Sequence, residues 1–189
     1  DAQPVEEQQP DAQPAEQPAE AQPAEQPPAA EAPAETVAPA EDAAQPAEDA
    51  DGGVDAQAIV DAHNRYRAKH CAPALTWSAG VAASAQHWAD ACSFSHQGGT
   101  GLGENLAWGT GVTGGGAVDM WYGEVADYDF ANPGFSGSTG HFTQVIWRGT
   151  TQVGCGRATC DGQSFWVCRY SPPGNFTGEF PENVSPVCQ

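Results

Sequence analysis

Two histidines and two glutamates in the C-terminal two-thirds of the chain are the residues best suited to chemistry. Glu104 stands in a strand-like apolar run, and Glu124 falls near the buried face of a helical segment. His96 and His141 lie in or beside glycine-rich turns. Two imidazoles and two carboxylates can hold a divalent metal or exchange protons, because neutral histidine suits zinc and carboxylates add charge. The spacing alone favours neither chemistry over the other.

Each of these histidines, taken singly, is more commonly a structural or surface residue than a ligand. That interpretation is kept for the remaining three, His63, His70 and His87. A carboxylate close to a buried helical face, as expected for Glu124, needs a partner.

Three helical segments precede the last third of the chain. Asp55 is expected to cap a helix that runs to about His70, before Pro73. Ser78 is expected to cap a second helix, and a third follows Gly116. The apolar stripe of the second is Val81, Ala85, Trp88 and Cys92, and that of the third is Val118, Trp121, Tyr122, Val125 and Tyr128.

The last third begins with a short helix over His141–Arg148 and continues with two strands. The β-prone runs Val153–Thr159 and Ser164–Tyr170 flank Asp161-Gly162, which is a strong hairpin signal. Folding about that turn sets Cys155 opposite Cys168, so these two are expected to pair. Helices around a small antiparallel sheet predict an α+β domain in three layers, and about 135 residues suffice for a core.

Composition divides the chain near Gly52 and Gly53. Residues 1–53 are almost entirely Ala, Pro, Gln and acidic residues, without an aromatic, and are expected to form a disordered acidic tail. Residues 54–189 are expected to form the folded domain. The tail holds 14 of the 25 acidic residues, which leaves 11 against six basic ones. The mildly acidic domain therefore argues against a nucleic-acid partner, which requires clustered basic residues.

The cysteines and two sequons favour secretion. All six cysteines lie in the domain and their number is even, which is typical of a disulfide framework. Asn175 and Asn183 begin Asn-x-Ser/Thr sequons and are candidate glycosylation sites. No apolar run is long enough for a transmembrane segment and no signal peptide opens the chain, which a processed N-terminus would explain.

Several motifs, in order, closely resemble the signatures of the CAP superfamily (cysteine-rich secretory, antigen five and pathogenesis-related one proteins). They are His63-Asn64-x-x-Arg67, Gly103-Glu104-Asn105-Leu106, Trp121-Tyr122-x-Glu124, Gly140 to Trp147 with Val153-Gly154-Cys155-Gly156, and Phe165 to Tyr170 with Pro172-Pro173-Gly174-Asn175. The resemblance covers about Val54 to Pro186. It implies an α-β-α sandwich whose central cleft is lined by His96, Glu104, Glu124 and His141.

The same resemblance implies a possible cofactor and a disulfide pattern. Some relatives hold zinc or another divalent ion, such as magnesium, in the cleft, with His96 and His141 as the expected ligands. Cys92 is expected to pair with Cys160, and Cys155 with Cys168. Cys71 and Cys188 then pair by elimination.

The segments from Asp127 to Phe135 and from Asn175 to Val184 most resemble the fungal secreted branch, whose members bind and export sterols. The resemblance implies that sterols of the cholesterol or ergosterol type are partners, with fatty acids in a second groove beside the first helix. The expected sterol-binding loop is shorter than in the best-known binders and consists of Trp88, Cys92, Ser93, Phe94 and Ser95.

Two other functions stay open. One is a metal-dependent hydrolase or protease with Glu104 or Glu124 as base, although no His-Glu-x-x-His helix and no nucleophile elbow occur. The other is a secreted effector or signal, recognised by a host, cell-wall or receptor partner through a surface or through a peptide from the region Pro172 to Gln189. The expectation is that the chain is not an enzyme.

Overall fold

The computed structural model describes residues 53–188. The predicted tail lies outside these residues except for Gly53. The helices are α1 (Ala56–Lys69), α2 (Ala79–Asp90), α3 (Gly114–Gly123), α4 (Gly140–Ile146) and α5 (Phe180–Asn183), with a 3₁₀ turn η1 (Glu124–Asp127). The strands are β1 (Thr76–Trp77), β2 (Gly103–Gly109), β3 (Gln152–Cys160) and β4 (Gln163–Ser171).

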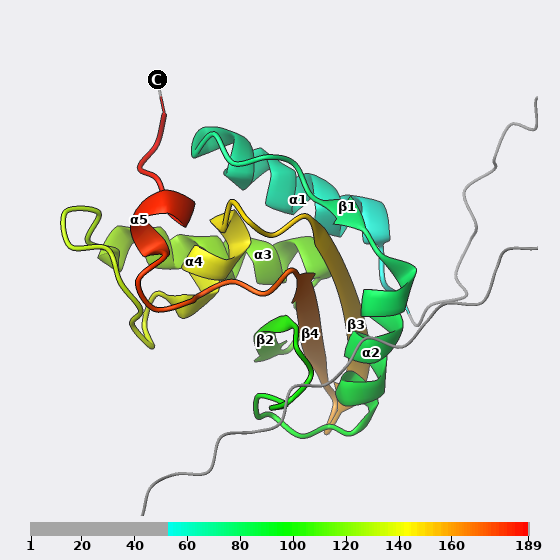
Figure 1. Cartoon of the computed structure of the whole chain (residues 1–189). Helices are drawn as coiled ribbons and strands as arrows, with labels where there is room; N and C mark the ends of the chain where they lie inside the picture. The colour runs from blue at the N-terminus through cyan, green and yellow to red at the C-terminus, as the bar shows by residue number, and fades with distance from the viewer. Residues whose placement is uncertain (1–52, 189) are drawn as a thin grey trace, which may run out of the picture. The chain divides into compact units, whose positions relative to one another are not determined.

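The four strands form one sheet in the order β1-β3-β4-β2. Strands β3 and β4 form the antiparallel hairpin that the sequence predicts, and β2 pairs antiparallel with β4. The two-residue β1 joins β3 in parallel and makes the sheet mixed. Helix α2 packs on one side of the sheet, and α1, α3 and α4 pack together on the other (Figure 1). The structure is therefore an α+β domain with three layers, in agreement with the prediction.

Strand β4 separates two apolar clusters because its side chains alternate between the two faces. Trp166, Cys168 and Tyr170 belong to the large cluster shared with α1, α3 and α4. Phe165 and Val167 belong to the smaller cluster under α2. A strand covered on both faces reads as a continuous apolar run, which is what the sequence shows here.

The predicted helix starts are confirmed where a cap fixes them. Asp55 and Ser78 accept hydrogen bonds from backbone N–H groups in the first turns of α1 and α2. Helix α3 begins earlier than predicted, at Gly114, because Thr113 caps it through the N–H of Gly116, at 3.0 Å.

Two predicted apolar stripes extend past the helices that carry them. Cys92 lies beyond the end of α2, whose buried residues are Val81, Ala82, Ala85 and Ala89. Helix α3 stops at Gly123, so Val125 and Tyr128 belong to η1 and its end.

Three disulfides close the domain, and the described residues contain no free cysteine. All three predicted pairings are confirmed: Cys92–Cys160, Cys155–Cys168 and Cys71–Cys188. In residues 53–188 no helix has both the length and the apolar character needed to cross a bilayer.

Candidate functional site

A cleft of about 410 Å³ opens at the start of the edge strand β2. Three of the four predicted residues, His96, Glu104 and His141, line it, and Glu124 lies behind His141. The structure therefore brings together the four side chains that the sequence selected. The other lining residues are Asn105, Phe135, Gly137, Gly140 and Asn175.

Glu104 holds the first imidazole. Its carboxylate accepts a hydrogen bond from His96 Nδ1 at 3.0 Å, another from the backbone N–H of Gln97 at 3.0 Å, and two from the Arg169 guanidinium. Burial by itself raises the pKa of Glu104, but these hydrogen bonds outweigh it and the pKa is lowered. The hydrogen bond to Glu104 in turn raises the pKa of His96.

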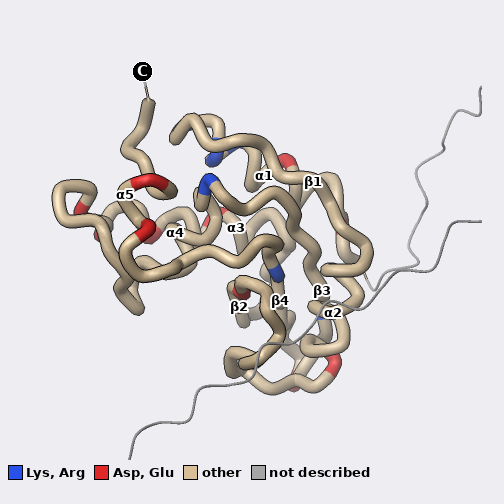
Figure 2. The backbone as a smooth tube through the Cα atoms, in the orientation of Figure 1, with Lys and Arg blue, Asp and Glu red and all other residues tan. Residues whose placement is uncertain are grey.

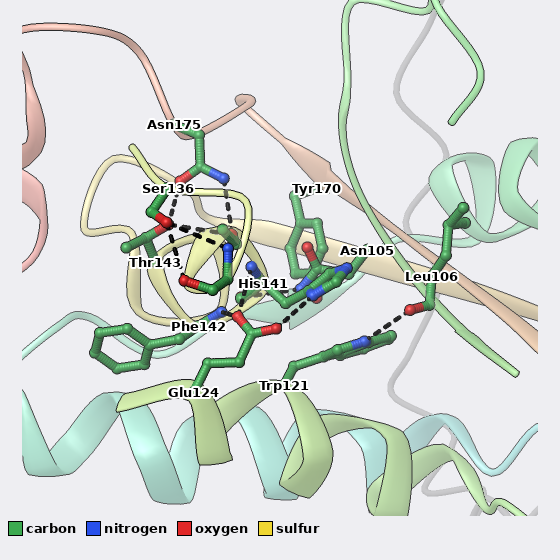
Figure 3. Close-up of polar contacts among 12 residues, drawn as sticks. Asn105, Leu106, Trp121, Glu124, Ser136, His141, Phe142, Thr143, Tyr170 and Asn175 are labelled. Carbon is green, nitrogen blue, oxygen red and sulfur yellow. Dashed lines mark hydrogen bonds and ion pairs between the residues drawn. The ribbon is translucent and has the colours of Figure 1, made fainter. Parts of the chain in front are cut away.

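Glu124 holds the second imidazole and also caps a helix (Figure 3). Its Oε1 lies 2.7 Å from His141 Nδ1, and its Oε2 accepts the backbone N–H groups of His141 and Phe142, each at 3.0 Å. The side chain of Thr139 makes no capping bond to α4, so Glu124 supplies the cap from a distant element. The partner that the sequence required for this carboxylate is thus the N-terminus of α4.

The two imidazoles are held in the same way. An ionised carboxylate only accepts hydrogen bonds, so Nδ1 is the donating nitrogen in both rings, and in a neutral ring Nε2 is then the nitrogen with the lone pair. Within the described residues neither Nε2 has a hydrogen-bond partner. The ring centroids of His96 and His141 are 6.5 Å apart. Each histidine is therefore oriented by a glutamate and presents an open nitrogen.

Two successive residues of β2 link the pairs across the sheet edge. Glu104 bonds His96, and the Nδ2 of Asn105 donates to the backbone oxygen of His141 at 3.1 Å. Neighbouring residues of a strand point to opposite faces, so the cleft is assembled from both sides of β2. Beside it, the indole of Trp121 stacks on the ring of His141 at 6.2 Å between centroids (Figure 3).

The residues fit a divalent metal by donor type. Imidazole nitrogens backed by carboxylates are the usual arrangement of histidine ligands to zinc. Two rings sharing one tetrahedral zinc would have centroids about 5 Å apart, somewhat closer than the 6.5 Å between His96 and His141. The side chain of His96 is 63% exposed. No group of three or more His, Cys, Asp or Glu in residues 53–188 is arranged around one point.

Several residues of the cleft were not selected from the sequence. Asn105 and Phe135 lie in quoted motifs, but the motifs do not show which side chains face the cleft. Asn175 was selected only as a glycosylation site, yet its amide lines the cleft, donates to Gly140 O at 2.9 Å and accepts from Thr143 Oγ1 at 2.6 Å (Figure 3). Glycosylation at Asn175 stays a prediction.

The amide of the other sequon, Asn183, is also hydrogen-bonded. Its Oδ1 accepts from Gly149 N–H and its Nδ2 donates to Glu179 O, each at 2.9 Å. Glycosylation at Asn183 likewise stays a prediction.

Phe94 of the predicted sterol loop packs on the face of the sheet that α2 covers. Phe94 is 59% exposed and makes edge-to-face contacts with Trp108 and Phe165, at centroid distances of 5.6 and 5.7 Å. These two rings belong to the apolar cluster between α2 and the sheet. The indole N–H of Trp88 donates to Ser95 O at 2.8 Å and fixes the base of the loop. Phe94 thus covers an aromatic surface.

The remaining histidines are structural or exposed, as predicted. His63 is fully buried, with Nδ1 on Ile59 O and Nε2 on the Tyr170 hydroxyl, and burial lowers its pKa to about 4. His70 bonds Ser185 O and the Tyr122 hydroxyl. His87 is exposed on α2.

Comparison with known proteins gives a consistent picture. A family model described as "Cysteine-rich secretory protein family" (CAP) matches residues 60–170. Protein PRY2 of Saccharomyces cerevisiae is 49% identical over 137 residues, 69% of this chain and 41% of PRY2. A probable pathogenesis-related protein of Arthroderma benhamiae is 40% identical over 143 residues, 66% of this chain and 46% of the relative. The chain therefore spans less than half the length of these two fungal relatives.

A shorter relative and two solved structures match over more of their length. The human Golgi-associated plant pathogenesis-related protein 1 is 41% identical over 139 residues, 68% of this chain and 90% of its own length. The crystal structure of NaASP2 with Zn²⁺ has a TM-score of 0.60 at 24% identity and covers 74% of this chain and 90% of its own. BmVAL-1 has a TM-score of 0.59 at 26% identity, with 71% and 82% covered. Both share this fold.

Proposed function

The chain belongs to the cysteine-rich secretory protein family, and from that premise we propose that it is an extracellular protein that binds sterols and exports or sequesters them. The family assignment makes it a protein of the secretory, pathogenesis-related type. Three disulfides agree with an oxidising compartment. The sterol function is the more specific step and rests on the resemblance to the fungal secreted branch together with one structural observation.

That observation is the exposed Phe94 over an aromatic surface. A planar apolar ligand needs a partly apolar flap that can move away from an apolar floor. Phe94 supplies the flap, and Trp108 and Phe165 supply the floor. More than half of the phenylalanine stays in solvent, so its displacement by a ligand costs little burial while the ligand gains the aromatic contacts.

The test is a titration of the purified full chain with radiolabelled cholesterol or ergosterol, with and without a chelator. We expect Phe94→Arg to abolish sterol retention, because the apolar ring that would cover the sterol is replaced by a charged group whose burial against the ligand is costly. Phe176→Arg is the matched control, since Phe176 is also exposed and lies outside the loop. Sterol binding that persists in folded Phe94→Arg protein would refute this site.

We also propose that the cleft holds a divalent ion such as zinc or magnesium. The Nε2 atoms of His96 and His141 would be the ligands, with Glu104 and Glu124 fixing both rings. Such an ion would supply a fixed positive charge and an activated water. Isothermal titration with zinc, compared between wild type and His141→Ala, measures this directly, and equal affinity in the two proteins would refute it.

We propose that fatty acids bind in a second cavity, for which the sequence analysis named no residues. It has a volume of about 500 Å³ and lies at the N-terminal ends of α1 and α3. Val112 and Trp166 offer apolar walls, and Arg157 offers a cation for a carboxylate. We expect Arg157→Gln to weaken palmitate binding about tenfold without changing sterol binding, whereas equal palmitate affinity would place fatty acids elsewhere.

The hydrolase alternative has the two glutamate–histidine pairs in its favour. A carboxylate on Nδ1 and an open Nε2 are what a general base requires. That alternative requires turnover of a peptide or ester that disappears in His141→Ala and depends on zinc. The signalling alternative requires that a protein unable to bind lipid still elicits a response.

A further inference from the structure

Arg169 is a buried arginine whose donors are fully used. It is 1% exposed and is the only lysine or arginine of β4, the blue segment on that strand in Figure 2. Its Nε and Nη2 donate to Glu104 Oε2 at 3.1 and 3.0 Å, and Nη1 donates to Ser84 O at 3.0 Å. Nη1 also donates to Ser84 Oγ, and Nη2 to Gln97 Oε1. All five N–H groups of the guanidinium are therefore bonded.

These acceptors come from three separate segments. Ser84 belongs to α2, Glu104 is the second residue of β2, and Gln97 lies in the loop of residues 91–102 that joins the two. A single guanidinium thus bridges both elements that flank the loop and the loop itself.

The loop carries residues of both proposed sites. Phe94 covers the aromatic surface, and His96 lines the cleft. At its first end the loop is fixed by the Cys92–Cys160 disulfide and by the bond from Trp88 to Ser95. In the middle of the loop, Arg169 bonds the side chain of Gln97, and Glu104 bonds the side chain of His96.

We infer that Arg169 is the positioning residue of this loop, holding Gln97 and Glu104 so that Phe94 and His96 are presented together. The part of this inference that concerns sterol retention rests on the proposed function. The part that concerns the loop stands on the hydrogen bonds alone. Lysine cannot replace the arginine, because an ammonium has three donors and no planar fork to reach three segments.

The experiment is amide hydrogen exchange on the full chain, compared between wild type, Arg169→Lys and Gln97→Ala. The hydrogen bonds of Arg169 to Ser84, Gln97 and Glu104 are called the clamp below. Both variants remove bonds of the clamp, and Gln97→Ala does so while the buried guanidinium of Arg169 stays in place. We expect exchange in residues 91–102 to become about tenfold faster in Arg169→Lys and several-fold faster in Gln97→Ala. The rest of the sheet should change far less.

The chain offers a matched control in Arg67, its other fully buried arginine. Arg67 donates only to backbone oxygens, those of Pro73, Val145, Trp147 and Thr150, and none of these acceptors belongs to the loop. Arg67→Lys should lower the free energy of unfolding. The exchange rate of residues 91–102, relative to that of the rest of the sheet, should stay as in wild type. If Arg67→Lys loosened the loop as much as Arg169→Lys does, a general loss of stability would be the explanation and the inference would fail.

Two outcomes separate this inference from the proposed function. A loop that exchanges at the wild-type rate in both folded variants overturns the clamp, and if Arg169→Lys does not fold, Gln97→Ala decides alone. A loosened loop supports the clamp whatever happens to sterol. Sterol release should then be several-fold faster in Gln97→Ala, and unchanged release from a loosened loop would count against the sterol site only.

Discussion

At the scale of single residues, buried polar groups of this domain form directed chains of hydrogen bonds. His63 donates from Nδ1 to Ile59 O, so its Nε2 must accept the hydroxyl proton of Tyr170. Tyr170 in turn accepts from Asn105 Nδ2, which also reaches the backbone of His141. Burial raises the pKa of Tyr170, so the phenol keeps its proton. The cleft is thereby tied to the centre of α1.

This chain predicts how stability depends on pH. The pKa of His63 is about 4 in the fold and 6.5 in the unfolded chain, so the unfolded chain takes up the proton first as the pH falls. Above pH 6.5 His63 makes its full contribution to the free energy of unfolding. As the pH falls to about 4, this contribution is lost progressively, by about 3 kcal/mol in total. Urea denaturation at several pH values measures it.

The control for this prediction is His63→Gln, which cannot be protonated. We expect this variant to be less stable at neutral pH and to lose less stability on acidification. Parallel pH profiles for wild type and His63→Gln would contradict the assignment.

A second residue-scale prediction concerns Glu124. Glutamine in its place loses the charge that faces the first N–H groups of α4, so we expect a loss of about 1–2 kcal/mol, as for other helix caps. Denaturation followed by circular dichroism provides the measurement. Asp127→Asn, an exposed change in the same turn, should stay within about 0.5 kcal/mol of wild type. A loss of equal size in both variants would remove the special role of Glu124.

The sequence predicted the four cleft residues but not what holds them. Glu104 lies in a quoted motif and His96 was placed in the cleft by the family resemblance, and residue type alone says that a carboxylate and an imidazole can pair. The role of Arg169 was not predicted, because it depends on β4 pairing with β2, on both side chains pointing toward α2, and on the path of the loop. Contacts of this kind join segments far apart in the chain, and no local pattern encodes them.

At the scale of elements, two glycines of β3 set the distance between the sheet and α2. A Cβ on Gly154 would lie 2.2 Å from Ala82 N, and one on Gly156 would lie 2.3 Å from the Cα of Gln86. Side chains there would push α2 off the strand. Packing therefore explains the motif Val153-Gly154-Cys155-Gly156. Gly154 and Gly156 face α2 and have no side chain, while Cys155 faces the opposite layer.

Alanine substitutions test this packing. Gly154→Ala should cost about 3 kcal/mol or more, because backbone atoms and not a flexible side chain occupy the space. Gly80→Ala, in the first turn of α2, meets nothing within 4 Å and should be neutral or stabilising by about 0.5–1 kcal/mol. Thermal unfolding of the two variants distinguishes them, and equal effects would show that α2 can shift freely.

Elements were predicted well where the signal is local. The caps Asp55 and Ser78 and the Asp161-Gly162 turn each lie next to the structure they start or close, and all three were confirmed. The parallel pairing of β1 with β3 was not predicted, because its partners, Thr76 with Gln152 and Trp77 with Val153, are far apart in the chain.

At the scale of the whole molecule, the Cys71–Cys188 disulfide ties the end of α1 to the C-terminal segment across 117 residues. Replacing both cysteines by serine should lower the free energy of unfolding by about 4 kcal/mol, because the unfolded chain regains the entropy of a long loop. Cys71 is exposed and Cys188 half-buried, so little packing is lost with them. Denaturant titration is the measurement, and a loss below about 1 kcal/mol would mean that the segment is held mainly by Phe180 and Val184.

The six tryptophans are unevenly placed, and this gives the domain an optical readout. Trp121, Trp147 and Trp166 are buried in the large cluster, and Trp77 packs partly buried against it. Trp88 and Trp108 are half-buried beside the loop that carries Phe94. Indoles in these two settings differ in emission wavelength and in access to a quencher such as iodide. The fluorescence of Trp88 and Trp108 can therefore report on a ligand bound beside Phe94, through energy transfer to a sterol that carries a conjugated polyene. The emission of the buried tryptophans serves as an internal reference.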